Sequence, residues 1–137
     1  MQTFQPYSDS EFSDENPIPE HIATDKTGRI FISFGHGISE IQVFSRDGVY
    51  QFKFGNFTSA CGIHITAKDN VIIAEREQRT LSLYSTSGQF VQQLVALSNG
   101  LQMFPHAVTV VNGGCLAVTC GDEMFAAPTW LHLFKLG

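Results

Sequence analysis

The chain has 137 residues, enough for a single-domain core, with 8 Lys and Arg against 13 Asp and Glu and a formal net charge of −5. Five of the acidic residues fall within the first twenty positions, so residues 21–137 are neutral overall. No apolar run approaches the roughly twenty residues that a membrane-spanning helix needs. We therefore expect no membrane partner, and the few basic residues do not favour an extended nucleic-acid-binding stripe.

The first eighteen residues predict a short strand followed by an acidic linker. Residues 2–5 alternate in character and form the candidate strand, whereas residues 6–18 are polar and acidic. A terminal strand of this kind commonly pairs with a sheet built by the other end of the chain, which removes an exposed edge. We expect it to be the fourth strand of such a sheet or of a preceding one.

Three copies of one pattern follow, over residues 19–55, 61–94 and 104–137. Ile22, Ile63 and Val108 share one column of the aligned copies, so the copies are 41 and then 45 residues apart. Internal periods of this size are typical of propellers and solenoids. The copies therefore predict a packed unit that is built three times.

Each copy predicts four short antiparallel strands, because β-branched and aromatic residues alternate with polar ones between turn residues. In the first copy we expect strands at 21–25, 29–33, 40–45 and 49–54, with tight turns that end in Gly28 and Gly48. Four such strands form one blade of a β-propeller. The third copy stops after its third strand.

The predicted fold is thus all-β, a partial or half β-propeller of about three blades. Propellers typically have about four to eight blades, so three do not close a ring. Two possibilities remain open: the chain belongs to a longer propeller that supplies the remaining blades, or two copies of the chain assemble into one ring.

The segments Pro19 to Ile32 and Ile41 to Gly55, which read PEHIATDKTGRIFI and IQVFSRDGVYQFKFG, resemble the NHL repeat. The second copy matches less closely and the third mainly by its inner strands. His21 stands where the family usually has Gly. The resemblance implies a binding scaffold without chemistry or cofactor of its own, such as the substrate-recognition end of a cytoplasmic tripartite-motif ubiquitin ligase. Some relatives bind single-stranded RNA, which is the alternative partner to a protein.

Three histidines carry an enzyme hypothesis, because peptidyl-hydroxyglycine lyases are similar propellers that hold zinc with inner-strand histidines. His21, His64 and His106 each lie in or beside an inner strand. Their positions in the aligned copies predict that His21 and His64 share a face and that His106 points to the other. Because zinc needs three ligands, we expect no metal site and no catalytic residues.

Cys61, Cys115 and Cys120 form no CxxC pair and are expected to be reduced thiols of an intracellular protein. Cys115 and Cys120 should face opposite sides of a strand.

Loops at one end of the blades are the predicted binding surface. The last loop, residues 121–130, is longer than its counterpart and contains the only Trp, and exposed aromatic residues on loops are frequent binding hot spots. The candidate binding residues are Phe34, His36, Arg76, Arg79, Met124, Phe125 and Trp130.

Overall fold

The computed structural model describes residues 19–34, 40–57, 60–95, 104–111, 114–121 and 130–135. These residues form three antiparallel sheets, which confirms the predicted all-β fold. No helix in this part of the chain is long and apolar enough to span a membrane. The predicted strand at 2–5 and the linker at 6–18 lie outside the described residues.

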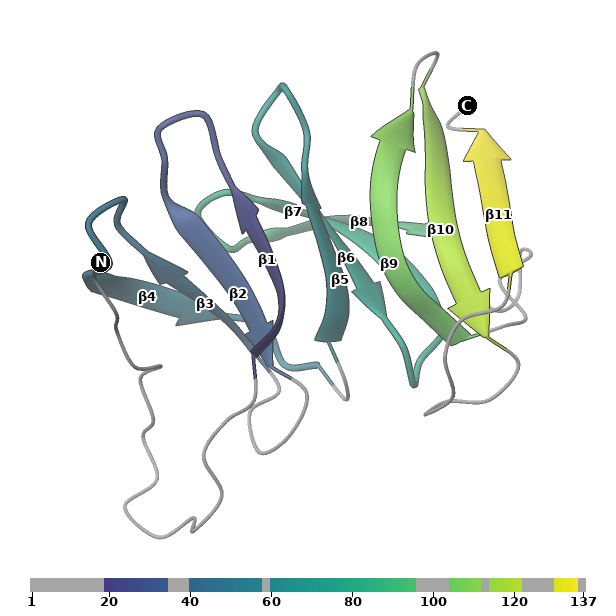
Figure 1. Cartoon of the computed structure of the whole chain (residues 1–137), viewed down its shortest axis with the longest axis horizontal. Helices are drawn as coiled ribbons and strands as arrows, with labels where there is room; N and C mark the ends of the chain where they lie inside the picture. The colour runs from purple at the N-terminus through teal and green to yellow at the C-terminus, as the bar shows by residue number, and fades with distance from the viewer. Residues whose placement is uncertain are drawn as a thin grey trace, which may run out of the picture.

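Each sheet follows chain order (Figure 1). The first sheet contains β1 (Pro19–Thr24), β2 (Ile30–Phe34), β3 (Ile41–Phe44) and β4 (Tyr50–Phe54). The second contains β5 (Ala60–Ile65), β6 (Asn70–Glu75), β7 (Thr80–Ser85) and β8 (Phe90–Val95). The third contains β9 (Phe104–Val111), β10 (Cys115–Gly121) and β11 (Trp130–Lys135). The four strands predicted for the first copy are therefore confirmed to within one or two residues at each end.

The three sheets stand side by side as blades 1, 2 and 3 of a partial β-propeller, and their first strands β1, β5 and β9 are neighbours (Figure 1). The outer strands fan apart from this inner row. Blade 3 has three strands in the part of the chain that the structure describes, and β11 is its outer edge.

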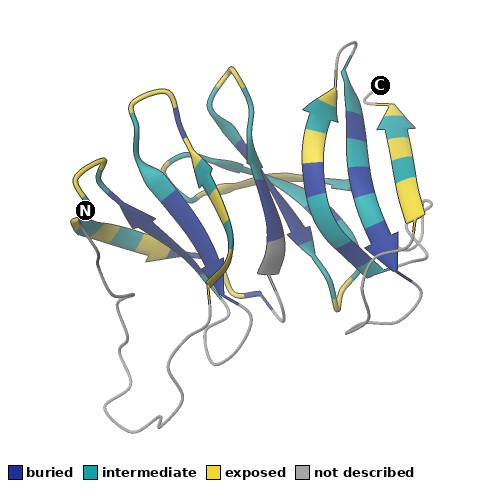
Figure 2. Ribbon diagram, viewed as in Figure 1, coloured by how far each residue is buried: buried dark blue, intermediate teal, exposed yellow. Residues whose placement is uncertain are grey.

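Two hydrophobic cores lie between the blades (Figure 2). Between blades 1 and 2, the buried residues are Phe31, Ile41, Val43, Phe54, Phe57, Ile63, Val71 and Ile73. Between blades 2 and 3, they are Ile72, Ala74, Leu81, Val95, Val108, Leu116, Val118 and Cys120. The middle strand β6 is buried along most of its length because its two faces contribute to different cores. Burial of these side chains is the main force that holds the blades together.

Gly62 allows the inner strands of blades 2 and 3 to approach closely. A Cβ atom at this position would lie 2.8 Å from the carbonyl oxygen of His106 and 3.0 Å from the Cα of Ala107. Real Cβ atoms do not approach backbone this closely, so any larger residue would push β5 and β9 apart. The spacing of the inner row therefore depends on a glycine at this position.

The hairpin turns at one end of the blades share one hydrogen-bond pattern. The side chains of Asp25, Ser45, Thr66 and Ser85 each accept a bond from the backbone N–H four residues later, over 2.9, 3.1, 3.1 and 3.1 Å. Side-chain acceptors of this kind satisfy turn amides that have no ladder partner. The predicted turn glycines Gly28 and Gly48 have φ of 88° and 82°.

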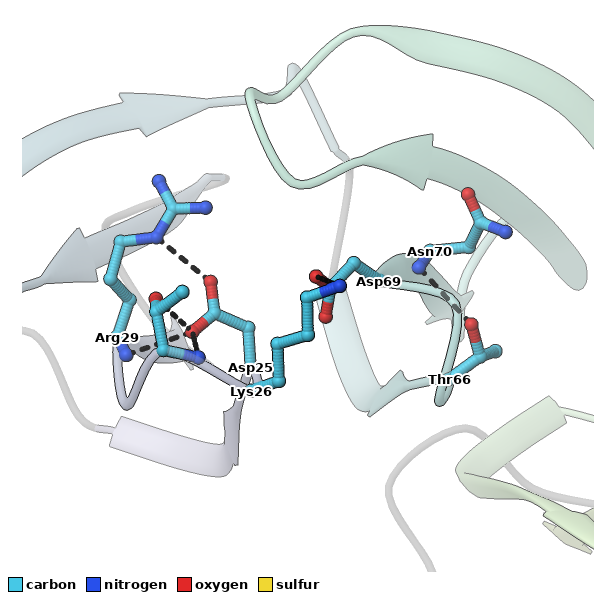
Figure 3. Close-up of polar contacts among 7 residues, drawn as sticks. Asp25, Lys26, Arg29, Thr66, Asp69 and Asn70 are labelled. Carbon is cyan, nitrogen blue, oxygen red and sulfur yellow. Dashed lines mark hydrogen bonds and ion pairs between the residues drawn. The ribbon is translucent and has the colours of Figure 1, made fainter.

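An ion pair joins two of these turns across the gap between blades 1 and 2. Lys26 Nζ lies 3.1 Å from Asp69 Oδ2, while Arg29 Nε donates to Asp25 Oδ2 over 2.8 Å within the first turn (Figure 3). Lys26 is largely exposed, and such pairs contribute about 0–1 kcal/mol. The ion pair therefore connects the two turns but contributes little to the stability of the fold.

We predict that Gly88→Ala destabilises the protein more than Gly114→Ala does. Both glycines have positive φ, +89° and +78°, but a Cβ at Gly88 would lie 2.6 Å from Phe54 whereas Gly114 has nothing within 4 Å. The backbone strain costs about 1–2 kcal/mol in each variant, and the clash should add about 1–3 kcal/mol to Gly88→Ala. Urea unfolding measures both, and equal losses would show that the β7–β8 turn does not pack on blade 1.

We also predict that Asp25→Asn destabilises the protein in a pH-dependent way. Burial would raise the pKa of Asp25, but bonds from Thr27 and Arg29 and the Arg29 charge outweigh it, so the pKa lies below its ordinary 3.8. The stabilisation is therefore present above pH 3.8 and is lost as the pH falls through the lower, folded-state pKa.

Asp25→Asn should cost about 1.5–3 kcal/mol at pH 7, typical of a charged hydrogen bond, and less below about pH 4. Unfolding in urea at several pH values measures the difference. The matched control is Asp47→Asn, at an exposed turn position, with an expected change within about 0.5 kcal/mol. A loss at Asp25 that stays constant from pH 7 to pH 3 would contradict the assignment.

Candidate functional site

The candidate site lies at the end of the blades opposite to the hairpin turns. Here β1, β5 and β9 begin and β2, β6 and β10 end, at the lower edge of the view in Figure 1. The strands that flank the three predicted binding loops, β2 and β3, β6 and β7, and β10 and β11, end and begin at this same end. Residues from all three blades can therefore meet here.

Each inner strand has a β-bulge close to this end. The register skips one residue between Pro19 and His21, between Ala60 and Gly62, and between Ala107 and Pro105. The extra residues are therefore Glu20, Cys61 and His106, which occupy equivalent positions in the three repeats. A bulge interrupts the strict alternation of side chains and re-aims its residues, and bulges are frequent beside functional sites.

The bulges bring His21 and His106 together. Their ring centroids are 5.6 Å apart with an interplanar angle of 71°. The prediction that His106 points away from His21 is therefore wrong, because simple alternation does not hold across a bulge. His64 instead lies beside blade 3, with its Nδ1 3.4 Å from the hydroxyl of Thr109.

Arg76 connects this histidine pair to blade 2. Its side chain is only 11 % exposed, and one terminal nitrogen lies 3.8 Å from Glu20 Oε2. Its Nε is buried and has no hydrogen-bond partner among the described residues. A buried donor without a partner costs free energy and needs an explanation, of which a role in a functional site is one. Arg76 is thus the least satisfied polar group described at this end.

Arg79 occupies the other end of the same turn. It adopts φ of 53°, which is uncommon for a residue other than glycine, and its guanidinium carbon lies 4.1 Å from the centroid of Phe104. This cation–π contact joins the β6–β7 turn to the start of β9. The turn that contains the strained Arg79 thus contacts Phe104 of blade 3 and links blades 2 and 3.

The surroundings keep both imidazoles neutral near pH 7. Burial is the largest cause that lowers the pKa of His21, followed by repulsion from His106. Burial and the positive charge of Arg76 likewise lower the pKa of His106, while Glu20 acts in the opposite direction. Burial alone lowers the pKa of His64. The site therefore combines two neutral imidazoles with a partly buried guanidinium.

The predicted binding residues are distributed unevenly. Arg76 and Arg79 lie in the site, and Trp130, at the start of β11, is 55 % exposed. Phe34 is fully buried in a cluster with Ile32 and Phe44 on the far face of blade 1, so its predicted role as a surface contact is wrong. His36, Met124 and Phe125 lie outside the described residues.

The thiols that the structure describes play no part in the site. Cys115 and Cys120 are both free. Cys120 belongs to the core between blades 2 and 3, which does not include Cys115, and burial raises the pKa of its thiol to about 11. A thiol in this state is unreactive.

The described residues do not fit a zinc site. No three His, Cys, Asp or Glu side chains among them are grouped so that they could hold a metal ion, and zinc needs at least three protein ligands. His21 and His106 provide two imidazoles beside a cation, Arg76, which disfavours a second positive charge.

Comparison with known proteins agrees with the fold, a partial β-propeller. No family model matches the chain. Peptidyl-glycine alpha-amidating monooxygenase B of Xenopus laevis is 27% identical across 98% of this chain, which corresponds to 16% of that protein. The chain thus spans about one sixth of this curated relative.

Solved lyase structures share the architecture at low identity. A catalytically inactive virginiamycin B lyase from Staphylococcus aureus with quinupristin has a TM-score of 0.63 at 13% identity over 91% of this chain and 43% of that one. A streptogramin B lyase structure has a TM-score of 0.58 at 12% identity, over 86% of this chain and 40% of that one. This chain therefore spans less than half of those propellers.

We predict that charge changes in the site move the two histidines together. Arg76→Met should raise the pKa of His21 and His106, because a repelling charge is lost, and Glu20→Gln should lower both, because an attracting charge is lost. NMR pH titration of the imidazole protons measures each value. His64 is the internal control and should not move. If His64 shifts equally, or neither partner of the pair responds, the charges do not act at this site.

Proposed function

We propose that this chain is the ligand-recognition part of a larger β-propeller and acts as a protein-binding module without catalysis of its own. The proposed site comprises Glu20 and His21 from blade 1, Arg76 and Arg79 from blade 2, and His106 from blade 3. Its partner would present a carboxylate. The remaining blades would come from the rest of a longer protein or from a second copy of the chain.

The observation that carries this proposal is the unsatisfied state of Arg76. One of its terminal nitrogens lies 3.8 Å from Glu20 Oε2, and its buried Nε has no hydrogen-bond partner in the part of the chain that the structure describes. A guanidinium can bind one carboxylate through two parallel hydrogen bonds. An incoming carboxylate could therefore pair with Nε and a terminal nitrogen at once. The neutral imidazoles of His21 and His106 could donate further bonds from their N–H groups.

A protein partner fits these residues better than single-stranded RNA does. Binding to RNA needs several cations along a groove, together with aromatic side chains on which bases stack. Among the described residues, the site offers two cations, Arg76 and Arg79, and the ring of Phe104 is already covered by Arg79. The NHL type of the repeats, a tripartite-motif ubiquitin ligase as the context, and a cytoplasmic location stay predictions from the sequence.

A lyase is the second candidate, and the specific observation in its favour is the 27% identity to the amidating monooxygenase over almost the whole chain. The histidine pair would then be part of a site completed by further blades. The absence of a three-ligand group among the described residues makes this the weaker candidate.

We predict that Arg76→Met weakens carboxylate recognition. The probe is an array of short synthetic peptides, each made in a Glu form and a matched Gln form, followed by affinity measurements on those that bind. The wild-type chain should prefer Glu forms. Arg76→Met should lose that preference and about tenfold or more in affinity, because a charge-assisted hydrogen bond contributes about 1.5–3 kcal/mol.

Arg46→Met is the matched control, because Arg46 is exposed in the β3–β4 turn at the opposite end of the blades. It should bind as the wild type does. Equal losses in both variants, or no Glu preference in the wild type, would contradict the proposal. Salt-sensitive binding of oligouridylate in place of peptides would support the RNA alternative. Zinc that survives dialysis and is lost in His21→Gln with His106→Gln would support the lyase.

A further inference from the structure

A cavity of about 600 Å³ opens between blades 2 and 3, at the hairpin-turn end of the blades and therefore away from the proposed protein-binding site. Its walls include Ile72 and Leu83 from blade 2 and Val110 and Phe134 from blade 3. Pockets that bind small molecules typically measure about 300–1,000 Å³ and are mostly apolar. The cavity has the size and the lining of such a site.

The equivalent space between blades 1 and 2 is filled with aromatic rings. Phe54 and Phe57 both contact Tyr84, with ring centroids 5.6 Å apart in each pair, and Phe52 packs beside Phe54. The turn at Gly88 comes close to the same Phe54. Aromatic side chains therefore occupy much of this position of the first interblade space.

The two interblade spaces differ because the repeats carry different residues at equivalent positions. In blade 1, Phe52 pairs with Val43 across the outer strands, and in blade 2 the equivalent pair is Gln92 with Leu83. Tyr84 of blade 2 corresponds to Phe134 of blade 3, so an aromatic ring is kept on one wall while its partner ring is lost. A large apolar side chain of blade 1 is thus replaced in blade 2 by an exposed amide that lines the cavity.

Two ammonium groups complete the cavity. Lys68, in the β5–β6 turn, and Lys135, at the end of β11, both line it. Neither has a carboxylate partner among the residues that the structure describes. An apolar wall beside two unpaired cations matches an apolar ligand that ends in a negative charge.

We propose that this cavity binds a single alkyl chain with a carboxylate head group. The chain packs against Ile72, Leu83, Val110 and Phe134, and the head group lies between Lys68 and Lys135. Burial of each methylene group favours binding through the hydrophobic effect. This site is independent of carboxylate recognition at Arg76, because the two lie at opposite ends of the blades.

The first experiment measures decanoate binding to the full chain by isothermal titration calorimetry. Gln92→Phe restores the residue of blade 1 and should weaken binding about tenfold or more, because the ring excludes several methylene groups. The matched control is Gln51→Phe, at an exposed position on β4, which should bind as the wild type does. Circular dichroism confirms that both variants are folded.

The second experiment tests the head group by comparing decanoate with 1-decanol. Lys68→Gln combined with Lys135→Gln should weaken decanoate binding roughly fivefold, as expected for exposed ion pairs, and leave 1-decanol binding unchanged. No decanoate binding at 1 mM, or equal binding by wild type and Gln92→Phe, would overturn the cavity assignment. Equal losses for acid and alcohol would overturn the head-group assignment. Arg76→Met should not affect either ligand.

Discussion

The close approach of β5 and β9 at Gly62 is the constraint on which the rest of the structure depends. With a backbone oxygen only 2.8 Å from where a Cβ would lie, the inner strands are nearly in contact, whereas the outer strands diverge. The space between two blades is therefore a wedge. At Gly62 the wedge leaves no room for a side chain, and farther out larger side chains fill the opening. The aromatic cluster around Tyr84 fills one wedge, and the smaller residues around Leu83 leave the other partly empty.

The two ends of the blades differ in their local structure. At the turn end, the same side-chain acceptor recurs at Asp25, Ser45 and Ser85, and the polar groups there are mostly satisfied. At the other end, bulges interrupt the ladders, Arg79 adopts a strained backbone and Arg76 keeps an unpaired buried donor. At the turn end, Asp69 likewise has a positive φ, of 59°, and a buried Oδ1 without a hydrogen-bond partner among the described residues, so strain and unsatisfied groups occur at both ends. The bulges of the inner strands and the histidine pair are therefore what distinguish the end that holds the candidate site.

The sequence predicted the strands well because β-branched and aromatic residues recur at equivalent positions of the three copies and turn residues such as Gly28 and Gly48 separate the runs. It predicted the histidine contacts poorly, because the alignment treats each inner strand as regular and contains no signal for an extra residue at Glu20 or His106. Glu20 and His106 lie 41 and 45 residues from Cys61, the extra residue of blade 2. This equivalence becomes informative only once one of the three bulges is known. Phe34 was misplaced for a related reason: its position beside a loop suggests exposure, whereas the register with Pro19 places it within the sheet.

The meander order of the sheets has a consequence for how the chain folds. Each described strand pairs within its sheet only with its neighbours along the chain. Only short loops are therefore closed within a blade, and the loss of loop-closure entropy is small. Contacts between distant residues arise mainly where one finished blade meets the next. The strand order of one blade therefore needs no strand from another blade, but the apolar faces of a blade are buried only when its neighbours pack against them.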